Sequence, residues 1–313
     1  MNIRTMNKID AFFRVGTRKR PISVAFLSST PTASRGSNSG QPKAPLDRDI
    51  ASLTNGLKVR GFNTCIIAPG LNSAPRPGDE VLTLPVPEYK PIGAVNIVKT
   101  EDENGTLLYL LSKQDDPSSF AQPFHQGNLS VLEKHGPASL FNFALARTAQ
   151  AIHESLLARE ASGESLIVHG YDETAAAVYL LAKHSVLTVF TLRDPAYHTL
   201  IPEAMAVYGS FNIDPYYQLS HKVPLQAGRG FDATELALLH AGRVTVKSQA
   251  AARQMFTSKF GPEPGLHYGE VLAARARIRQ ACGILDNDNT AVDKYLRRIY
   301  LPLLRQAFAE DCE

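Results

Sequence analysis

The stretch Val189-Phe-Thr-Leu-Arg-Asp-Pro-Ala-Tyr-His198 decides the fold of this chain. It continues a run of β-branched and aromatic residues, Val186 to Leu192, which is typical of a strand covered on both faces. Arg193 and Asp194 follow at once, and Pro195 forces a loop. Ligands of parallel α/β sheets bind at the carboxyl ends of the strands, so we expect both charged side chains at a ligand-bearing edge.

Expected strands and helices alternate on both sides of this stretch. The expected strands are 22–27, 63–68, 81–84, 94–98, 107–111, 165–168, 186–192 and 243–247, and the expected helices are 46–59, 137–159, 175–182 and 233–240. This alternation predicts an α/β fold with a doubly wound parallel sheet.

The composition is typical of a globular protein with a large core. With 313 residues, 44% of them hydrophobic, the chain could form one large α/β domain or two smaller ones. The net charge of +3 is small for this length, so we do not expect nucleic acid as a partner. No apolar run approaches the roughly 20 residues that span a bilayer, so we expect no membrane association.

The cysteines and the N-terminus bear on the cellular compartment. Cys65, Cys282 and Cys312 lack metal-ligand spacing, so we expect neither a disulfide framework nor a metal site, and the cytoplasm is the expected location. Residues 1–20 form a basic arm that we expect to be solvated and poorly ordered. A targeting or export signal is the alternative, which the absence of a continuous apolar run disfavours.

Two other strand ends carry polar residues. The loop from Ser28 to Pro45 lacks both G-x-G-x-x-G and G-x-x-x-x-G-K-[ST], so a surface loop is expected, with anion binding through backbone N–H groups as the alternative. The strand 165–168 leads into His169 and Asp172. His169 would titrate near neutrality or orient a sugar hydroxyl. Asp172 would cap the next helix or accept a hydrogen bond from a ligand hydroxyl.

Five segments between Ile22 and Asn289 carry recognisable motifs in a fixed order. They are 61–69 (GFNTCIIAP), 166–172 (LIVHGYD), 189–198 (VFTLRDPAYH), 238–248 (LLHAGRVTVKS), and 268–286, which begins YGE and ends GILD. Together they resemble the N-terminal catalytic domain of bacterial glycogen synthases and plant starch synthases, which are retaining glucosyltransferases of the GT-B fold. The second and third segments are similar to that family's V-V-H-A-H-D-W and V-F-T-[VI]-H-N-L-A-Y-Q.

The resemblance implies roles for individual residues and also shows departures. Arg193 stands at the position of the family's catalytic His, and Asp194 at that of the following Asn. Imidazole can be neutral, whereas guanidinium is permanently cationic and donates only. We therefore expect an ion pair of Arg193 with Asp194 or Asp172 in the place of the sugar.

Three further residues would contact substrate by the same resemblance. Lys43 lies near the position of the family's K-x-G-G-L lysine, which meets the donor phosphates, although Gln41-Pro-Lys-Ala-Pro-Leu46 has no glycine pair. Tyr197 and His198 stand at the Tyr and Gln that end the family's H-N-L-A-Y-Q motif. With Asp194 they complete the expected substrate-binding set.

The resemblance also implies that half of the donor site is missing. In the family, a C-terminal domain of similar size holds the nucleotide diphosphate. Here we expect a single GT-B N-terminal-type domain, 21–289, without the second Rossmann domain, followed by one amphipathic helix in 290–313. That helix is expected to pack back on the domain, with a kink at Pro302. A partner-binding helix is the alternative.

Two functions are compatible with this resemblance. In the first, the chain is a degenerate, non-catalytic relative that binds an α-glucan, a nucleotide sugar or a protein partner. In the second, it is a glucosyltransferase that moves glucose from ADP-glucose to an α-1,4-glucan, completed by a second subunit. Retaining transfer needs stabilisation of the departing diphosphate, and residues for it are missing, so the first is expected. No cofactor is expected, ADP-glucose being a donor substrate.

Overall fold

The computed structural model describes residues 22–29, 48–70, 79–86, 93–102, 104–113, 120, 131–157, 165–194, 199–203, 213, 223–225, 228–247, 249–257, 268–278, 280–284 and 291–310. Every structural statement below concerns these residues. The predicted basic arm, Lys43, Tyr197 and His198 lie outside them.

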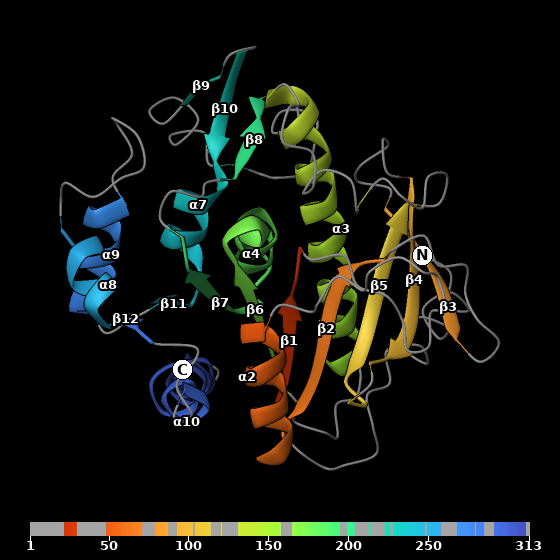
Figure 1. Cartoon of the computed structure of the whole chain (residues 1–313), viewed down its shortest axis with the longest axis horizontal. Helices are drawn as coiled ribbons and strands as arrows, with labels where there is room; N and C mark the ends of the chain where they lie inside the picture. Colours follow the sequence, from red (N-terminus) through yellow and green to blue (C-terminus); the bar gives the residue numbers. More distant parts are fainter. Residues whose placement is uncertain are drawn as a thin grey trace.

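A large twisted sheet forms the centre of the molecule (Figure 1). Its described strands are β1 (Ile22–Leu27), β2 (Asn63–Pro69), β3 (Glu80–Pro85), β4 (Ala94–Glu101), β5 (Leu107–Lys113), β6 (Ser165–Tyr171), β7 (Leu187–Leu192), β11 (Arg243–Val246) and β12 (Ala281–Gly283). They lie in the order β12-β11-β7-β6-β1-β2-β5-β4-β3. Strands from β12 to β5 are parallel, which confirms the predicted α/β fold.

Two features differ from the predicted all-parallel sheet. Strand β4 is antiparallel to both β5 and β3. The connections between these consecutive strands, 86–93 and 102–106, are shorter than the dozen or so residues that a parallel crossover needs. A small second sheet joins β8 (Leu200–Pro202), β10 (Gly228–Asp232) and β9 (Val223–Leu225) in antiparallel order. Sequence patterning missed these short strands.

Helices cover both faces of the sheet. In Figure 1, α3 (Val131–Leu157), α4 (Ala175–Lys183) and α7 (Ala233–His240) lie above it, and α2 (Arg48–Val59) and α10 (Ala291–Tyr295) lie below. The π-helix η2 (Leu296–Tyr300) and α11 (Leu301–Glu310) continue α10, and α8 (Gln249–Met255) and α9 (Tyr268–Arg277) flank β12. Among these described helices, none has the length and hydropathy needed to cross a bilayer.

Strand β1 shows how the two faces are built. Its alternate residues Ala25 and Leu27 belong to the core under α3 and α4, whereas Val24 and Phe26 belong to the core under α2 and the C-terminal helix. Both pairs are fully buried, as a parallel sheet with two covered faces requires.

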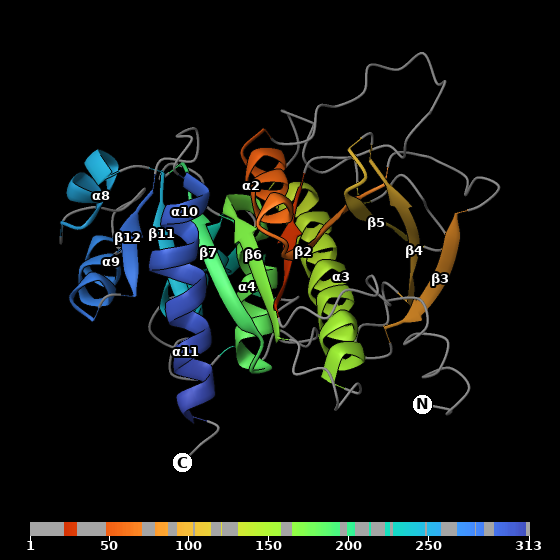
Figure 2. The same cartoon turned by 90° about the horizontal axis from the view of Figure 1, so that it is seen from below.

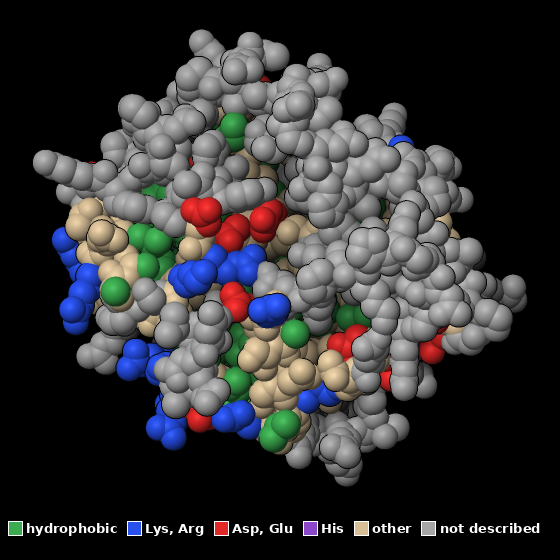
Figure 3. Space-filling view, in the orientation of Figure 1, with side chains coloured by type: hydrophobic (Ala, Val, Ile, Leu, Met, Phe, Trp, Pro, Cys, Tyr) green, Lys and Arg blue, Asp and Glu red, His purple; other side chains and the backbone are tan. Residues whose placement is uncertain are grey.

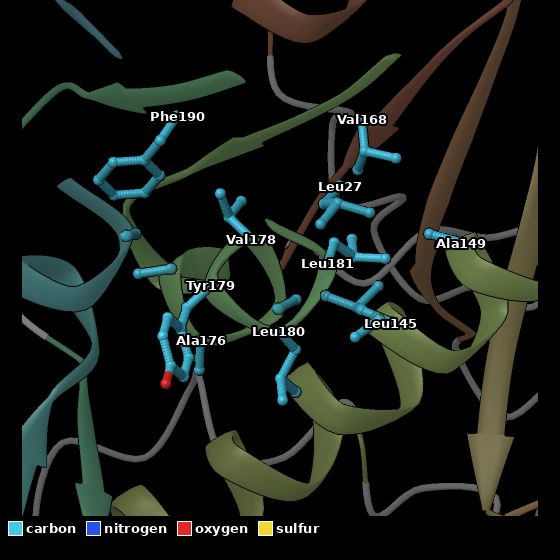
Figure 4. Close-up of a cluster of buried hydrophobic side chains, with 14 of the residues drawn as sticks. Leu27, Leu145, Ala149, Val168, Ala176, Val178, Tyr179, Leu180, Leu181 and Phe190 are labelled. Atoms are coloured by element: carbon cyan, nitrogen blue, oxygen red, sulfur yellow. The ribbon is translucent and has the colours of Figure 1, made fainter. Parts of the chain in front are cut away.

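Helix α4 packs directly on the sheet and positions the site. Figure 4 shows its residues Val178 and Leu181 against Leu27 and Val168, with Leu145 of α3 on the other side. A Cβ at Gly170 would collide with Val178 and with the hydroxyl of Thr174, so only glycine permits this close approach. The turn from β6 into α4 is therefore tightly held.

Candidate functional site

The strand order reverses between β1 and β6. The chain passes from β1 to β2 on one side, and from β6 to β7 and β11 on the other. In open α/β sheets ligands bind at such a switch point, outside the carboxyl ends of the strands. Ser28 follows β1, Asp172 and Glu173 follow β6, and Arg193 follows β7, so polar groups converge there.

The side chain of Arg193 lies at this switch point, and the place around it is called the crevice below because ligands of open α/β sheets bind there. Its Nε lies 3.1 Å from Oδ2 of Asp172, with side chains only 18% and 6% exposed. Its Nη1 and Nη2 each lie 4.0 Å from a further carboxylate, on Asp49 of α2 and on Glu173 respectively. The guanidinium carbon also lies 4.6 Å from the ring centroid of Tyr171, a cation–π contact. Of the two ion pairs predicted for Arg193, with Asp194 or with Asp172, the one with Asp172 is confirmed.

The carboxylate of Asp172 binds the end of β7 rather than a helix. Its Oδ1 accepts from the backbone N–H of Arg193 at 2.7 Å and from that of Asp194 at 3.4 Å. The N-cap of α4 is Thr174, and Asp172 begins the short 3-10 helix η1 (Asp172–Thr174). The capping role considered for Asp172 is therefore wrong. Two backbone donors just beyond β7 need an acceptor, and this carboxylate supplies it.

Acidic side chains lie around the guanidinium of Arg193. Burial raises the pKa of Asp172, although the charge and hydrogen bonds of Arg193 oppose that shift. Burial likewise raises the pKa of Glu173. Figure 3 shows Lys and Arg side chains lying directly against Asp and Glu side chains near the middle of this face. With Asp49, three carboxyl groups surround Arg193, so its charge is already compensated.

His169 is fully buried beneath the crevice. Its Nδ1 lies 2.7 Å from the hydroxyl of Tyr300, and its Nε2 lies 2.6 Å from that of Thr191. Burial, and then the nearby charge of Arg193, lower its pKa to about 3. The interpretation of His169 as a group titrating near neutrality is wrong, because its side chain points into the face that the C-terminal helix covers.

A polar network around His169 was not predicted. Thr191 on β7 and Thr245 on β11 are register partners, and their hydroxyls lie 2.5 Å apart. The hydroxyl of Tyr295 lies 3.4 Å from each. The sequence contained two signals for this network. Polar residues stand at matching positions of adjacent strands, and two tyrosines interrupt the apolar stripe of the C-terminal helix.

The described residues show no arrangement suited to a metal ion. Among them, no three His, Cys, Asp or Glu side chains cluster closely enough to bind one. Within the crevice, the arrangement offers charge-assisted hydrogen bonds from Arg193 and acceptors on Asp49 and Glu173. A neutral polyhydroxylated ligand can use both kinds of group.

Comparison with known proteins identifies the fold. No family model and no curated protein matches the sequence. The structure is similar to the catalytic domain of starch synthase IV from Arabidopsis thaliana, solved bound to ADP and acarbose, with a TM-score of 0.57 and 18% identity over 88% of this chain. The fold is therefore of the GT-B glycosyltransferase type, and the chain spans 52% of that starch synthase chain.

A second solved structure also aligns with the chain. It is a UDP-glucosyltransferase from Polygonum tinctorium, with 13% identity over 79% of this chain and 51% of the other. Its TM-score of 0.30 is too low to support a fold assignment.

Proposed function

We propose that this glycosyltransferase-like chain is a non-catalytic relative of the starch synthases and binds a neutral α-glucan at the carboxyl edge of its sheet. The observation that supports this most is the place of Arg193. Its guanidinium is paired with Asp172 in the switch-point crevice, where the resemblance expects the catalytic imidazole.

The groups around the crevice are poorly suited to retaining transfer. Guanidinium cannot accept a proton at ordinary pH. His169 stays neutral and is held at both ring nitrogens. The charge of Arg193, which would have to stabilise a departing diphosphate, is already compensated by Asp172.

The balance of charge favours a glucan over a nucleotide sugar. The carboxyl groups of Asp49 and Glu173 each lie 4.0 Å from Arg193, farther than the 3.1 Å between Arg193 and Asp172. A diphosphate placed beside them would meet like charges, and each such pair costs on the order of 1–4 kcal/mol at 4 Å near a surface. Glucan hydroxyls carry no charge and can donate to both carboxylates.

A second candidate function is ADP-glucose-dependent glucosyl transfer to an α-1,4-glucan. The observation in its favour is that the chain spans about half of the starch synthase chain it resembles. A separate subunit would then supply the nucleotide-binding half. In that case the added subunit must provide the cationic groups for the diphosphate.

Calorimetric titration with maltoheptaose and with ADP-glucose tests the proposal. We expect saturable heat with maltoheptaose and none with ADP-glucose. Glu173→Gln should weaken maltoheptaose binding several-fold, because a charged acceptor is lost. Glu270→Gln, an exposed position on α9, is the matched control and should leave it unchanged. Tighter binding of ADP-glucose than of maltoheptaose would refute the proposal.

A further inference from the structure

A cavity lies at the edge of the sheet opposite to Arg193. It has a volume of about 740 Å³ and opens at the amino ends of β6 and β7, between the last turn of α3, α9 and α11. Figure 2 shows α11 running along β7 on this side of the sheet. The polar residues that line it include His153, Thr188, His240, Arg275, Gln280 and Gln306. None of the described lining residues is Asp or Glu.

Arg275 lines this cavity, and Arg243 contacts the lining residue Gln306. The hydrogen-bond partners of both arginines are neutral among the described residues. Arg275 donates to the backbone carbonyls of Leu239, at 2.7 Å, and of Ala241. Arg243 is 7% exposed and donates from Nη1, at 2.9 Å in each case, to the carbonyl of Gly242 and to Oε1 of Gln306.

Neither guanidinium has a negatively charged partner among the described residues. Within the part of the chain that the structure describes, neither Arg243 nor Arg275 forms an ion pair, and the Nε of each is buried without a hydrogen-bond acceptor. Burial, and then the charge of Arg243, lower the pKa of Arg275 to about 10. Buried charges are normally paired, because desolvation of an isolated charge is costly.

We propose that this cavity binds a small phosphorylated metabolite, whose phosphate group lies near Arg275 and supplies the missing counter-charge to Arg275 and Arg243. A phosphate dianion matches two guanidiniums in charge, and Arg binds phosphate oxygens with well-directed N–H donors. The volume lies within the usual range for small-molecule pockets, so it admits more than the phosphate group itself.

This cavity is separate from the crevice at Arg193. Ser165, which lines the cavity, begins β6, and Tyr171 beneath Arg193 ends it. Seven residues of strand separate the two places by on the order of 20 Å. The inference therefore does not depend on the proposed glucan binding, and either can fail alone.

Thermal unfolding of the full chain with inorganic phosphate tests the inference. We expect phosphate at about 10 mM to raise Tm by about 3 °C more than sodium chloride of equal ionic strength does, because the ligand binds the folded state. Gln306→Glu places a carboxylate on Arg243. It should raise Tm without phosphate and abolish most of the phosphate-dependent rise.

Two more variants complete the experiment. Gln280→Glu, at another wall of the cavity, should likewise reduce the effect of phosphate, whether or not Gln306→Glu folds. Arg305→Gln removes a positive charge from an exposed position on α11, the helix that carries Gln306. This variant should respond to phosphate as the unmodified chain does. The inference is overturned if phosphate acts no differently from chloride, or if Gln280→Glu retains the full phosphate response.

Discussion

At the residue scale, Arg193 and His169 show how the environment of a side chain determines its chemistry. Arg193 is paired with Asp172 and stacked on Tyr171, so it is neither a free cation nor a proton acceptor. The ring of His169 stacks on the ring of Tyr171 as well, with ring centroids 4.6 Å apart. Both side chains are thereby fixed in place.

Burial of His169 predicts a pH dependence of stability. The folded-state pKa is about 3, whereas the unfolded chain takes up a proton near the ordinary value of 6.5. Below pH 6.5 the unfolded state therefore binds the proton and is favoured. We expect the contribution of this imidazole to the unfolding free energy to be complete above pH 6.5. It should fall toward pH 3, by up to ~1.4 kcal/mol per pH unit.

Urea unfolding between pH 7 and pH 4.5 measures this effect. His169→Gln should lower stability at pH 7 and show a shallower loss on acidification than the unmodified chain. His184→Gln, at an exposed position after α4, should retain the original slope. Asp172 and Glu173 are present in all three proteins, so their titration cancels in the comparison. Equal slopes for His169→Gln and the unmodified chain would contradict the account.

At the element scale, the C-terminal helix is joined to the sheet through a π-helical segment. Tyr295 and Tyr300 are five residues apart and would point in different directions in an α-helix of about 3.6 residues per turn. The wider turn Leu296–Tyr300 brings both hydroxyls to the network around His169 and Thr191. The predicted irregularity at Pro302 is thus a π-helix that ends just before it, rather than a simple kink.

Proline chemistry accounts for that position. Pro302 has no N–H group, and its ring would crowd the carbonyl of Arg298, four residues earlier, in a regular α-helix. In the structure the N–H of Leu301 donates to the carbonyl of Leu296, five residues earlier. Figure 2 shows α10 and α11 as one continuous column despite this change.

The close contact between α2 and α10 predicts how adding one methyl group at Gly56 changes the stability of the chain. A Cβ at Gly56 would collide with Cγ2 of Val292, which is 8% exposed. Within a helix, alanine is more favourable than glycine by ~1 kcal/mol. Overpacking of a core typically costs ~1–3 kcal/mol. We therefore expect Gly56→Ala to destabilise the chain by up to ~2 kcal/mol. Urea unfolding measures this difference.

A double-mutant cycle separates the collision from other effects. Val292→Ala removes the colliding methyl, so Gly56→Ala should be stabilising in that background. Asn55→Ala, exposed on the same helix, should change stability by less than ~0.5 kcal/mol in either background. If Gly56→Ala is as harmless as Asn55→Ala in the unmodified chain, the helix does not pack as described.

At the scale of the whole molecule, local patterns predicted the core of the sheet but not its margins. Strand β1 and helix α7 begin and end at the predicted residues, because hydrophobic periodicity and turn residues determine them locally. The antiparallel β4 pairs with the strands next to it in the sequence, and the small sheet consists of strands of three to five residues. Hydrophobic periodicity indicates neither the direction of pairing nor strands as short as these. At the site, the sequence predicted an ion pair of Arg193 with Asp194 or Asp172, and the structure has the pair with Asp172. The inward orientation of His169 was not predicted.

The two edges of the sheet also differ in charge. The carboxyl edge places Asp49, Asp172 and Glu173 around one arginine, and the amino edge has Arg243 and Arg275 without an acidic partner among the described residues. We therefore expect a neutral ligand at the first edge and an anion at the second. The chain has a GT-B glycosyltransferase-type fold, and our main proposal concerns the first edge, where we expect no glucosyl transfer.

Release of ADP from ADP-glucose, in the presence of glycogen, tests that claim most directly. We expect no release above a protein-free control, both for the unmodified chain and for Arg193→His, since the imidazole alone would not supply charge stabilisation for the diphosphate. Sustained release by the unmodified chain that Arg193→Ala abolishes would contradict it.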